Sequence, residues 1–212
     1  EFLAISSHEL FHAWNIKAIR PIELTPYDYT QENYTNLGYV AEGVTTLMGD
    51  LTLLRSGVWS LETFLIEFSG EFQKHFDNFG RFNYSVAQSS YDSWLDGYSA
   101  GIPNRKVSIY TEGSLLAFIA DVMICRASDF KNSLYDVMHY LYHEFYLNNK
   151  GFSEADYQFA LEKFSGISFQ TYFENFIWGT KEYKDELQEC LAFLGLLLLD
   201  TPSAVEHEAY LG

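Results

Sequence analysis

Residues 8–12 constrain the chain most, because the pattern His-Glu-Leu-Phe-His needs a helix to bring its polar side chains together. Side chains four positions apart on a helix share one face, so His8 and His12 can direct imidazole nitrogens at one point. Zinc favours such a pair, because it binds nitrogen ligands in a tetrahedral arrangement. Glu9 borders the same face, where a general base can act on metal-bound water. The pattern therefore predicts a helix that carries a zinc site.

A catalytic zinc site needs a third protein ligand and an open position. Glu42 is the best candidate, because enough chain separates it from His12 for a loop and a return on a second helix. Its neighbours in residues 38–43 are mostly apolar or glycine, so its carboxylate is expected to point inward and to need a partner there. The alternative is an ordinary buried carboxylate that pairs with a nearby cation.

The remaining histidines give weaker signals. His139 and His143 are also four residues apart, and Glu144 follows them, but no glutamate stands next to His139. We interpret this pair as a structural or surface feature. His75 and His207 are isolated in the sequence and carry no signal of a site.

The charge balance narrows the possible partners. The chain has 13 basic and 29 acidic residues among 212, which gives a formal charge of −16. Such a chain should repel nucleic acid and anionic membranes and attract cationic groups, including the free ammonium of a peptide. The alternative is an acidic surface that is simply solvated. No apolar run is long enough to span a membrane.

The sequence pattern indicates one mostly helical domain with little strand. Hydrophobic residues make up 48% of the chain, which is enough for a packed core. Helices are expected over residues 2–14, 31–56, 60–78, 108–126 and 184–193, and shorter ones after the capping residues Ser133 and Ser153. Short strands are expected only at residues 84–87 and 196–199.

Several further segments carry a resemblance to a known family. They are residues 8–17, Arg20-Pro21, 26–29, 32–34, Glu42-Gly43, 85–87, 89–90, 110–113 and 210–212. In this order, they resemble the glycyl aminopeptidase family of gluzincin zinc metallopeptidases. The likeness spans nearly the whole chain and is far more specific than the histidine pattern alone.

The resemblance implies a mainly α fold, the thermolysin-like helical catalytic domain of the gluzincins. Residues 1–195 would form this catalytic core, and residues 196–212 would be a linker or the start of a PDZ-like domain. By this comparison, we expect the N-terminal β region and the PDZ domain of the family to be missing from this chain. We therefore expect weak or no turnover from this core alone.

The resemblance also implies roles for individual residues. His8, His12 and Glu42 would bind one zinc ion, and Glu9 would act as the general base. The hydroxyl of Tyr110 would stabilise the tetrahedral intermediate. Substrates would be peptides with a free N-terminus and glycine or alanine as the first residue. The alternatives are a gluzincin endopeptidase and a peptide-binding protein without catalytic activity.

The chain departs from the family pattern at three positions. Leu10 replaces a usual aromatic residue and Ala18 a usual basic one, and neither is expected to touch the metal. Glu112 stands where the family usually has lysine, which reverses the charge two residues from Tyr110. This reversal bears on substrate preference more than on zinc binding. Thr45 or Thr46, together with Asn15, are the expected hydrogen-bond partners of the two histidines.

Overall fold

The computed structural model describes residues 2–96 and 102–199, and this part of the chain is almost entirely helical. The described β contacts are two isolated bridges, Asn15 with Ile19 and Pro21 with Phe152. The mainly α prediction is therefore confirmed. The α-helices are α1 (Phe2–Phe11), α2 (Thr45–Arg55), α3 (Leu61–Asp77), α4 (Val86–Tyr91), α5 (Ser93–Asp96), α6 (Thr111–Ala127), α7 (Leu134–Glu144), α8 (Glu154–Ser165), α9 (Gln170–Tyr172) and α10 (Lys184–Phe193). Two π-helices, η2 (Tyr39–Val44) and η5 (Phe173–Ile177), and three 3-10 helices, η1 (Ile22–Leu24), η3 (Phe79–Phe82) and η4 (Tyr146–Asn148), complete the described elements.

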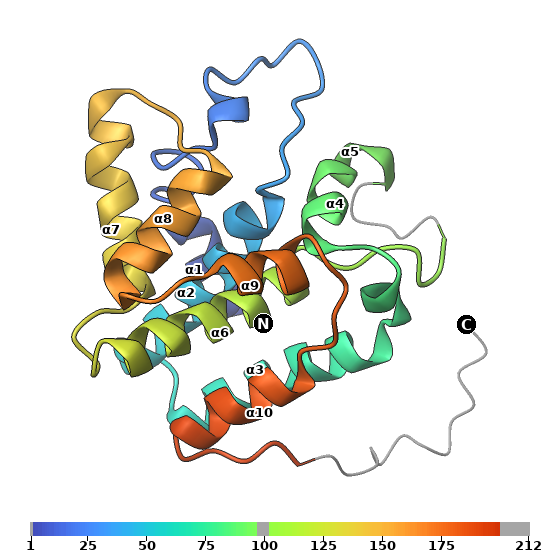
Figure 1. Cartoon of the computed structure of the whole chain (residues 1–212), viewed down its shortest axis with the longest axis vertical. Helices are drawn as coiled ribbons and strands as arrows, with labels where there is room; N and C mark the ends of the chain where they lie inside the picture. Colours follow the sequence, from blue (N-terminus) through green and yellow to red (C-terminus); the bar gives the residue numbers. More distant parts are fainter. Residues whose placement is uncertain (1, 97–101, 200–212) are drawn as a thin grey trace.

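Helix α6 forms the centre of the domain (Figure 1). Its sequence is apolar on nearly all sides, which is typical of a helix buried all round. It packs against η2, α2, α3, α7, α8 and α10. Leu115, Ala120 and Ile124 are completely buried. The position of α6 therefore fixes the position of the residues that precede its first turn, including Tyr110.

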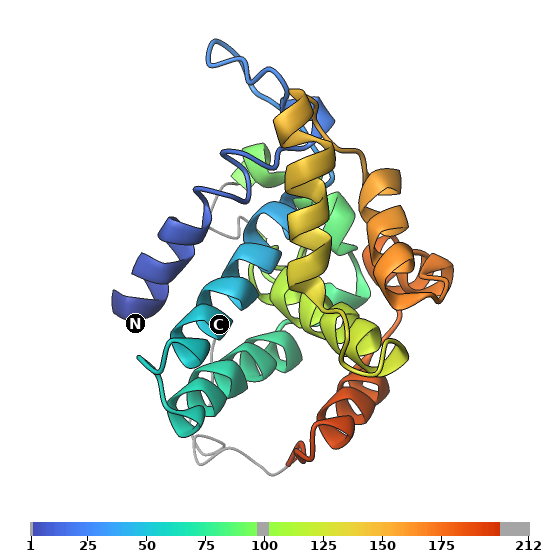
Figure 2. The same cartoon turned by 90° about the vertical axis from the view of Figure 1, so that its left-hand side faces the viewer.

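Helices α1 and α2 lie side by side (Figure 2), and a glycine permits their close approach. A Cβ atom on Gly49 would lie 3.1 Å from the backbone nitrogen of His8. The hydroxyl of Ser7 donates to the carbonyl of Gly49 at 2.8 Å. This contact holds the histidine-bearing helix against the segment that begins at Glu42.

A second close approach joins η2 to the start of α6. A Cβ atom on Gly43 would lie 2.3 Å from the Cα of Gly113. A Cβ atom on Gly113 would lie 2.7 Å from the carbonyl oxygen of Tyr39. Side chains larger than hydrogen do not fit at this crossing, so the two backbones touch. The crossing brings the neighbours of these glycines, Glu42 and Tyr110, into the same region.

Most predicted helix boundaries are confirmed by their caps. The Ser60 hydroxyl accepts from the Thr63 N–H at the start of α3, and Ser153 forms a capping box at the start of α8. Gly57 and Gly195 follow α2 and α10 with φ angles of 75° and 76°. Glycine reaches this left-handed conformation at little cost, which explains why both helices end there.

Three predicted helices start or end differently. Helix α6 begins at Thr111 rather than at residue 108. Helix α1 ends at Phe11 rather than at residue 14, although the His12 N–H still donates to the His8 carbonyl at 3.1 Å. The predicted helix over 31–56 is wrong in its first part, because η2 begins only at Tyr39. The Asn33 side chain instead bonds both backbone groups of Asp28, at 2.7 and 3.1 Å, and so stabilises a loop.

Both predicted strands are wrong. The Ser85 hydroxyl accepts from the Gln88 N–H at 3.2 Å, so it caps helix α4 instead of joining a strand. Residues 196–199 have no regular structure. Residues 200–212 of the predicted linker, with His207, lie outside the described residues, so the boundary after residue 195 stays a prediction.

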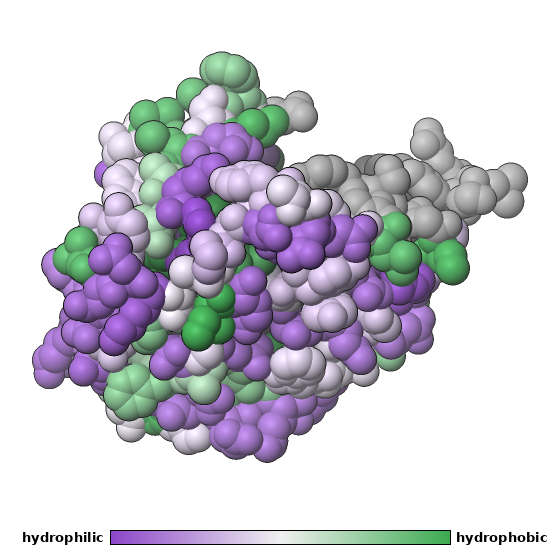
Figure 3. All heavy atoms as spheres, turned by 90° about the horizontal axis from the view of Figure 1, so that it is seen from above, coloured by the Kyte–Doolittle hydropathy of each residue, from purple (hydrophilic) through white to green (hydrophobic). Residues whose placement is uncertain are grey.

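In the part of the chain that the structure describes, every helix is too short or too polar to cross a membrane. On the face seen in Figure 3, hydrophobic residues stand in separate groups between hydrophilic ones. This surface agrees with the strongly acidic composition.

Candidate active site

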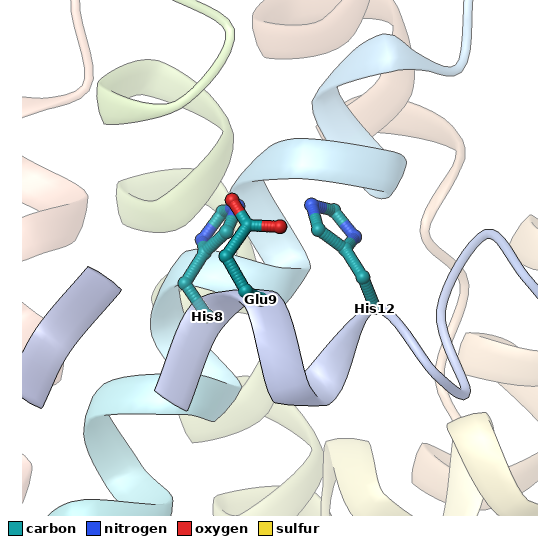
Figure 4. A group of neighbouring side chains, drawn as sticks. All are labelled: His8, Glu9 and His12. Carbon is teal, nitrogen blue, oxygen red and sulfur yellow. The ribbon is translucent and has the colours of Figure 1, made fainter. Parts of the chain in front are cut away.

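His8, Glu9 and His12 rise from the same side of α1 and the turn that follows it (Figure 4). One ligand atom of each lies within 4.8 Å of the others. The two imidazole rings are 4.6 Å apart between centroids and nearly perpendicular. Both histidines are half-buried and Glu9 is exposed. The local geometry expected from the sequence pattern is therefore present.

Glu42 completes the group from a distant part of the chain. Its Oε2 lies 3.2 Å from His8 Nε2 and 3.3 Å from His12 Nε2. The structure thus brings together all three residues that the sequence analysis names as ligands. Two carboxylates, Glu9 and Glu42, face the imidazole pair, one from the same helix and one from η2.

The π-helix η2 aims Glu42 at this point, and Asn15 stabilises it. A π-helix shifts the backbone hydrogen bonds by one residue, and such turns are frequent at functional sites. The buried Asn15 amide donates to the Val40 carbonyl at 2.8 Å and to the Thr45 hydroxyl at 3.0 Å. The Thr45 hydroxyl in turn donates to the Ala41 carbonyl at 2.6 Å. Asn15 therefore joins the segment after α1 to the backbone that carries Glu42.

Hydrogen bonds at the far side of each imidazole fix which nitrogen is free. His12 Nδ1 lies 3.0 Å from the Asn15 carbonyl, which only accepts, so this nitrogen donates. His8 Nδ1 lies 3.2 Å from the Thr46 hydroxyl, which donates its own proton to the Glu42 carbonyl at 2.9 Å. His8 Nδ1 therefore donates as well. Both neutral imidazoles present the lone pair of Nε2 to Glu42, as metal-binding histidines do.

These contacts confirm Asn15 and Thr46 as hydrogen-bond partners of the histidines. A carboxylate only accepts hydrogen bonds, so the two Nε2 atoms and Glu42 need a proton or a metal ion between them. The shifted pKa values of Glu42 and His12 have the same cause. Burial alone would raise the pKa of Glu42, but hydrogen bonds with His12 and His8 lower it to about 2. Burial lowers the pKa of His12, but Glu42 and the Asn15 carbonyl outweigh it and raise the pKa.

Tyr110 lies beside this group, directly before α6. Its ring centroid is 5.9 Å from that of His8. The phenol is half-buried, and it lines a cavity next to the site. The structure therefore places all five residues named from the sequence, His8, Glu9, His12, Glu42 and Tyr110, in one region.

A buried cluster near Tyr110 was missed from the sequence. His75 is completely buried, and its Nδ1 lies 2.8 Å from Glu112 Oε1. The Tyr183 hydroxyl donates to the other Glu112 oxygen. His75 is therefore isolated in the sequence but has partners in the fold. Only the fold joins the end of α3, the first turn of α6 and the residue before α10.

The second histidine pair stays outside the site. His139 and His143 are exposed on α7, with ring centroids 4.3 Å apart. This placement agrees with their interpretation as a surface feature.

A helical domain in which a His-Glu-x-x-His turn faces a second carboxylate from another element is typical of the class of metallopeptidases. The sequence model of the M61 glycyl aminopeptidases matches residues 1–116, more than half of the chain. The chain therefore belongs to this family, which confirms the resemblance seen in the sequence. No curated protein matches it.

A solved structure supports the same relationship. The crystal structure of an aminopeptidase N family protein from Idiomarina loihiensis matches with a TM-score of 0.81 and 30% sequence identity. The match covers 88% of this chain and 32% of that one, so this chain spans about a third of its structural relative.

Proposed function

We propose that the protein is a zinc-dependent aminopeptidase that hydrolyses the first peptide bond of peptides with glycine or alanine at the N-terminus. The observation that carries this proposal is the position of Glu42 Oε2, 3.2 and 3.3 Å from the Nε2 atoms of His8 and His12. With bonds of about 2.0–2.1 Å to zinc, ligand atoms of a tetrahedral site lie roughly 3.3–3.4 Å apart. The two spacings therefore fit a zinc ion held by His8, His12 and Glu42.

Glu9 is the general base in this proposal, although its carboxylate also lies near both imidazoles. Glu42 is the better third ligand, because it contacts both Nε2 atoms and reaches them from a separate element. Glu9 is exposed, so it can meet a water molecule. It takes a proton from the attacking water and passes it to the leaving amine.

When bound, zinc supplies a Lewis acid that activates water and polarises the scissile carbonyl. Thr46 and the Asn15 carbonyl hold the two imidazoles in the tautomer that leaves Nε2 available. The Tyr110 phenol, next to His8, donates a hydrogen bond to the oxygen on which negative charge develops.

The preference for a small first residue is supported by the M61 glycyl aminopeptidase match. Two other functions share the same fold. An endopeptidase would use the same residues on internal bonds, and a peptide-binding protein would use the cleft without hydrolysis.

The decisive experiment measures zinc content and peptide hydrolysis of the purified protein and three variants. We expect about one zinc per chain, lost in His12→Ala and retained in Glu9→Gln and Tyr110→Phe. Hydrolysis of Ala-Leu-Ala should fall by at least about a hundredfold in both Glu9→Gln and Tyr110→Phe. Equal activity of Glu9→Gln and the unaltered protein would refute the proposed mechanism.

N-acetylated Ala-Leu-Ala separates the other two functions. An aminopeptidase needs the free N-terminus and leaves the acetylated peptide intact. Internal cleavage of blocked peptides would identify an endopeptidase. Peptide binding without cleavage by the zinc-loaded protein would identify a non-catalytic binding protein.

A further inference from the structure

A cavity of about 440 Å³ opens beside the proposed reaction centre. Thr46 and Tyr110 are among the residues that line it, and both are neighbours of His8. Glu71 and Lys74 on α3 also line it. This volume falls in the range of roughly 300–1,000 Å³ that is usual for small-molecule sites. A side chain next to the scissile bond could therefore extend from the reaction centre into this space.

The cavity wall carries more negative groups than positive ones. Glu71 and Glu112 oppose a single lysine, Lys74. Both Glu112 oxygens are engaged inside the protein by His75 and Tyr183. Glu71 remains as the carboxylate that can pair with a substrate.

At present Glu71 pairs with Lys74, at 2.6 Å between Nζ and Oε1. The Glu71 side chain is only 14% exposed, whereas that of Lys74 is 65% exposed. An exposed lysine on a flexible stem contributes little to such a pair and can swing away at small cost. Glu71 is therefore a partly desolvated carboxylate whose cation can be exchanged.

Asp50 lies close enough to Glu71 and Glu67 for their negative charges to interact. Burial, and after it the negative charges of Glu71 and Glu67, raise the pKa of Asp50 from its ordinary value of 3.8 to about 6. Carboxylates that oppose each other's ionisation in this way favour an additional positive charge.

We propose that this cavity binds a basic side chain, lysine or arginine, at the second residue of the substrate, with Glu71 as its partner. The inference rests on the proposed function, because glycine or alanine as first residue would leave a cavity of this size unfilled. The first residue then occupies the space at the metal ligands, and the side chain that follows the scissile bond enters the cavity.

The test compares Ala-Lys-Ala with Ala-norleucine-Ala, in which the side chain keeps the four carbons of lysine and lacks the terminal ammonium group. We expect kcat/KM to be about tenfold higher for the lysine peptide, which corresponds to about 1.4 kcal/mol. Glu71→Gln should bring the two peptides to parity and leave the norleucine peptide unchanged. Lys74→Met should increase the preference for lysine, because it removes the competing cation.

Glu67→Gln is the matched control, since Glu67 is exposed one turn earlier on the same helix and does not line the cavity. It removes the same charge and should keep the lysine preference. The proposal would be overturned if Glu71→Gln kept the preference for Ala-Lys-Ala over Ala-norleucine-Ala, or if Glu67→Gln lost as much of it as Glu71→Gln. A preference for lysine as the first residue, in Lys-Ala-Ala, would overturn it as well.

Binding provides a readout that does not depend on turnover. Calorimetry on the Glu9→Gln protein should give about tenfold tighter binding of Ala-Lys-Ala than of Ala-norleucine-Ala, and Glu71→Gln in that background should abolish the difference. Absence of all hydrolysis with this binding preference intact would refute the aminopeptidase function and keep the cavity assignment. Hydrolysis without any binding preference would refute only the cavity assignment.

Discussion

The contact between Gly43 and Gly113 gives the sharpest test of how this fold builds its site. We predict that Gly43→Ala destabilises the protein although alanine is the better helix former. The added Cβ would lie 2.3 Å from the Gly113 Cα, and its neighbours there are backbone atoms that cannot rotate away. Carbon atoms in contact normally lie about 3.5–4.0 Å apart, so η2 and α6 would have to separate by roughly 1 Å or more.

The magnitude follows from two opposing effects. Overpacking of a tight core costs about 1–3 kcal/mol, and a backbone obstacle places this site near the upper end. The replacement of glycine by alanine within a helix stabilises the folded state by about 1 kcal/mol through helix propensity. We therefore expect a net loss of about 2 kcal/mol in the free energy of unfolding. The same shift would move Glu42 away from Tyr110, so hydrolysis should fall as well.

Gly70→Ala is the matched control, because Gly70 lies within α3 and a Cβ there would meet nothing within 4 Å. It should stabilise the protein by about 1 kcal/mol through helix propensity alone. Urea unfolding of both variants with a chelator present excludes the contribution of bound metal. Equal stabilisation by the two alanines would refute the argument that the helix backbones touch at Gly43.

Three further predictions concern charge and metal binding. The pKa of Asp50 is raised to about 6 from 3.8, so ionisation of this carboxyl lowers the stability of the folded protein as the pH rises through this range. Asp50→Asn should leave the free energy of unfolding unchanged at pH 3.5. At pH 8 it should increase the free energy of urea unfolding by about 1–2 kcal/mol, a value that allows for the partial exposure of Asp50. Thr46→Val removes the hydrogen-bond acceptor of His8 and should weaken zinc binding by at least about tenfold in competition with a chromophoric chelator. The pKa of His12 is raised above its ordinary 6.5, so protons should compete with zinc: zinc affinity should drop steeply between pH 8 and pH 5, and a flat profile would contradict this.

Features with local causes could be predicted from the sequence. The His8 and His12 pair depends only on the helical repeat, and its geometry survives even though α1 ends at Phe11. Ser60 and Gly195 mark helix ends because capping groups bond the backbone within a few residues. The predicted strand at 84–87 failed for a related reason, since the Ser85 cap outweighs a short β-like run.

The approach of Glu42 to the histidines could be guessed from its apolar neighbours but not established. It depends on the π-helical turn, the Asn15 hydrogen bonds and the close packing at Gly43. His75 gave no signal at all, because its partner Glu112 is distant in the chain and pairs with it only across α3 and α6.

The sequence by itself determined the helical character, most helix ends and the turn that carries His8, Glu9 and His12, because each follows from interactions within about one helical turn. Only the tertiary structure decided that Glu42 and Tyr110 meet this turn, and that Glu71 and Lys74 border a cavity beside it. These spatial arrangements depend on how closely separate backbones approach, and that distance is set by contacts between residues far apart in the chain.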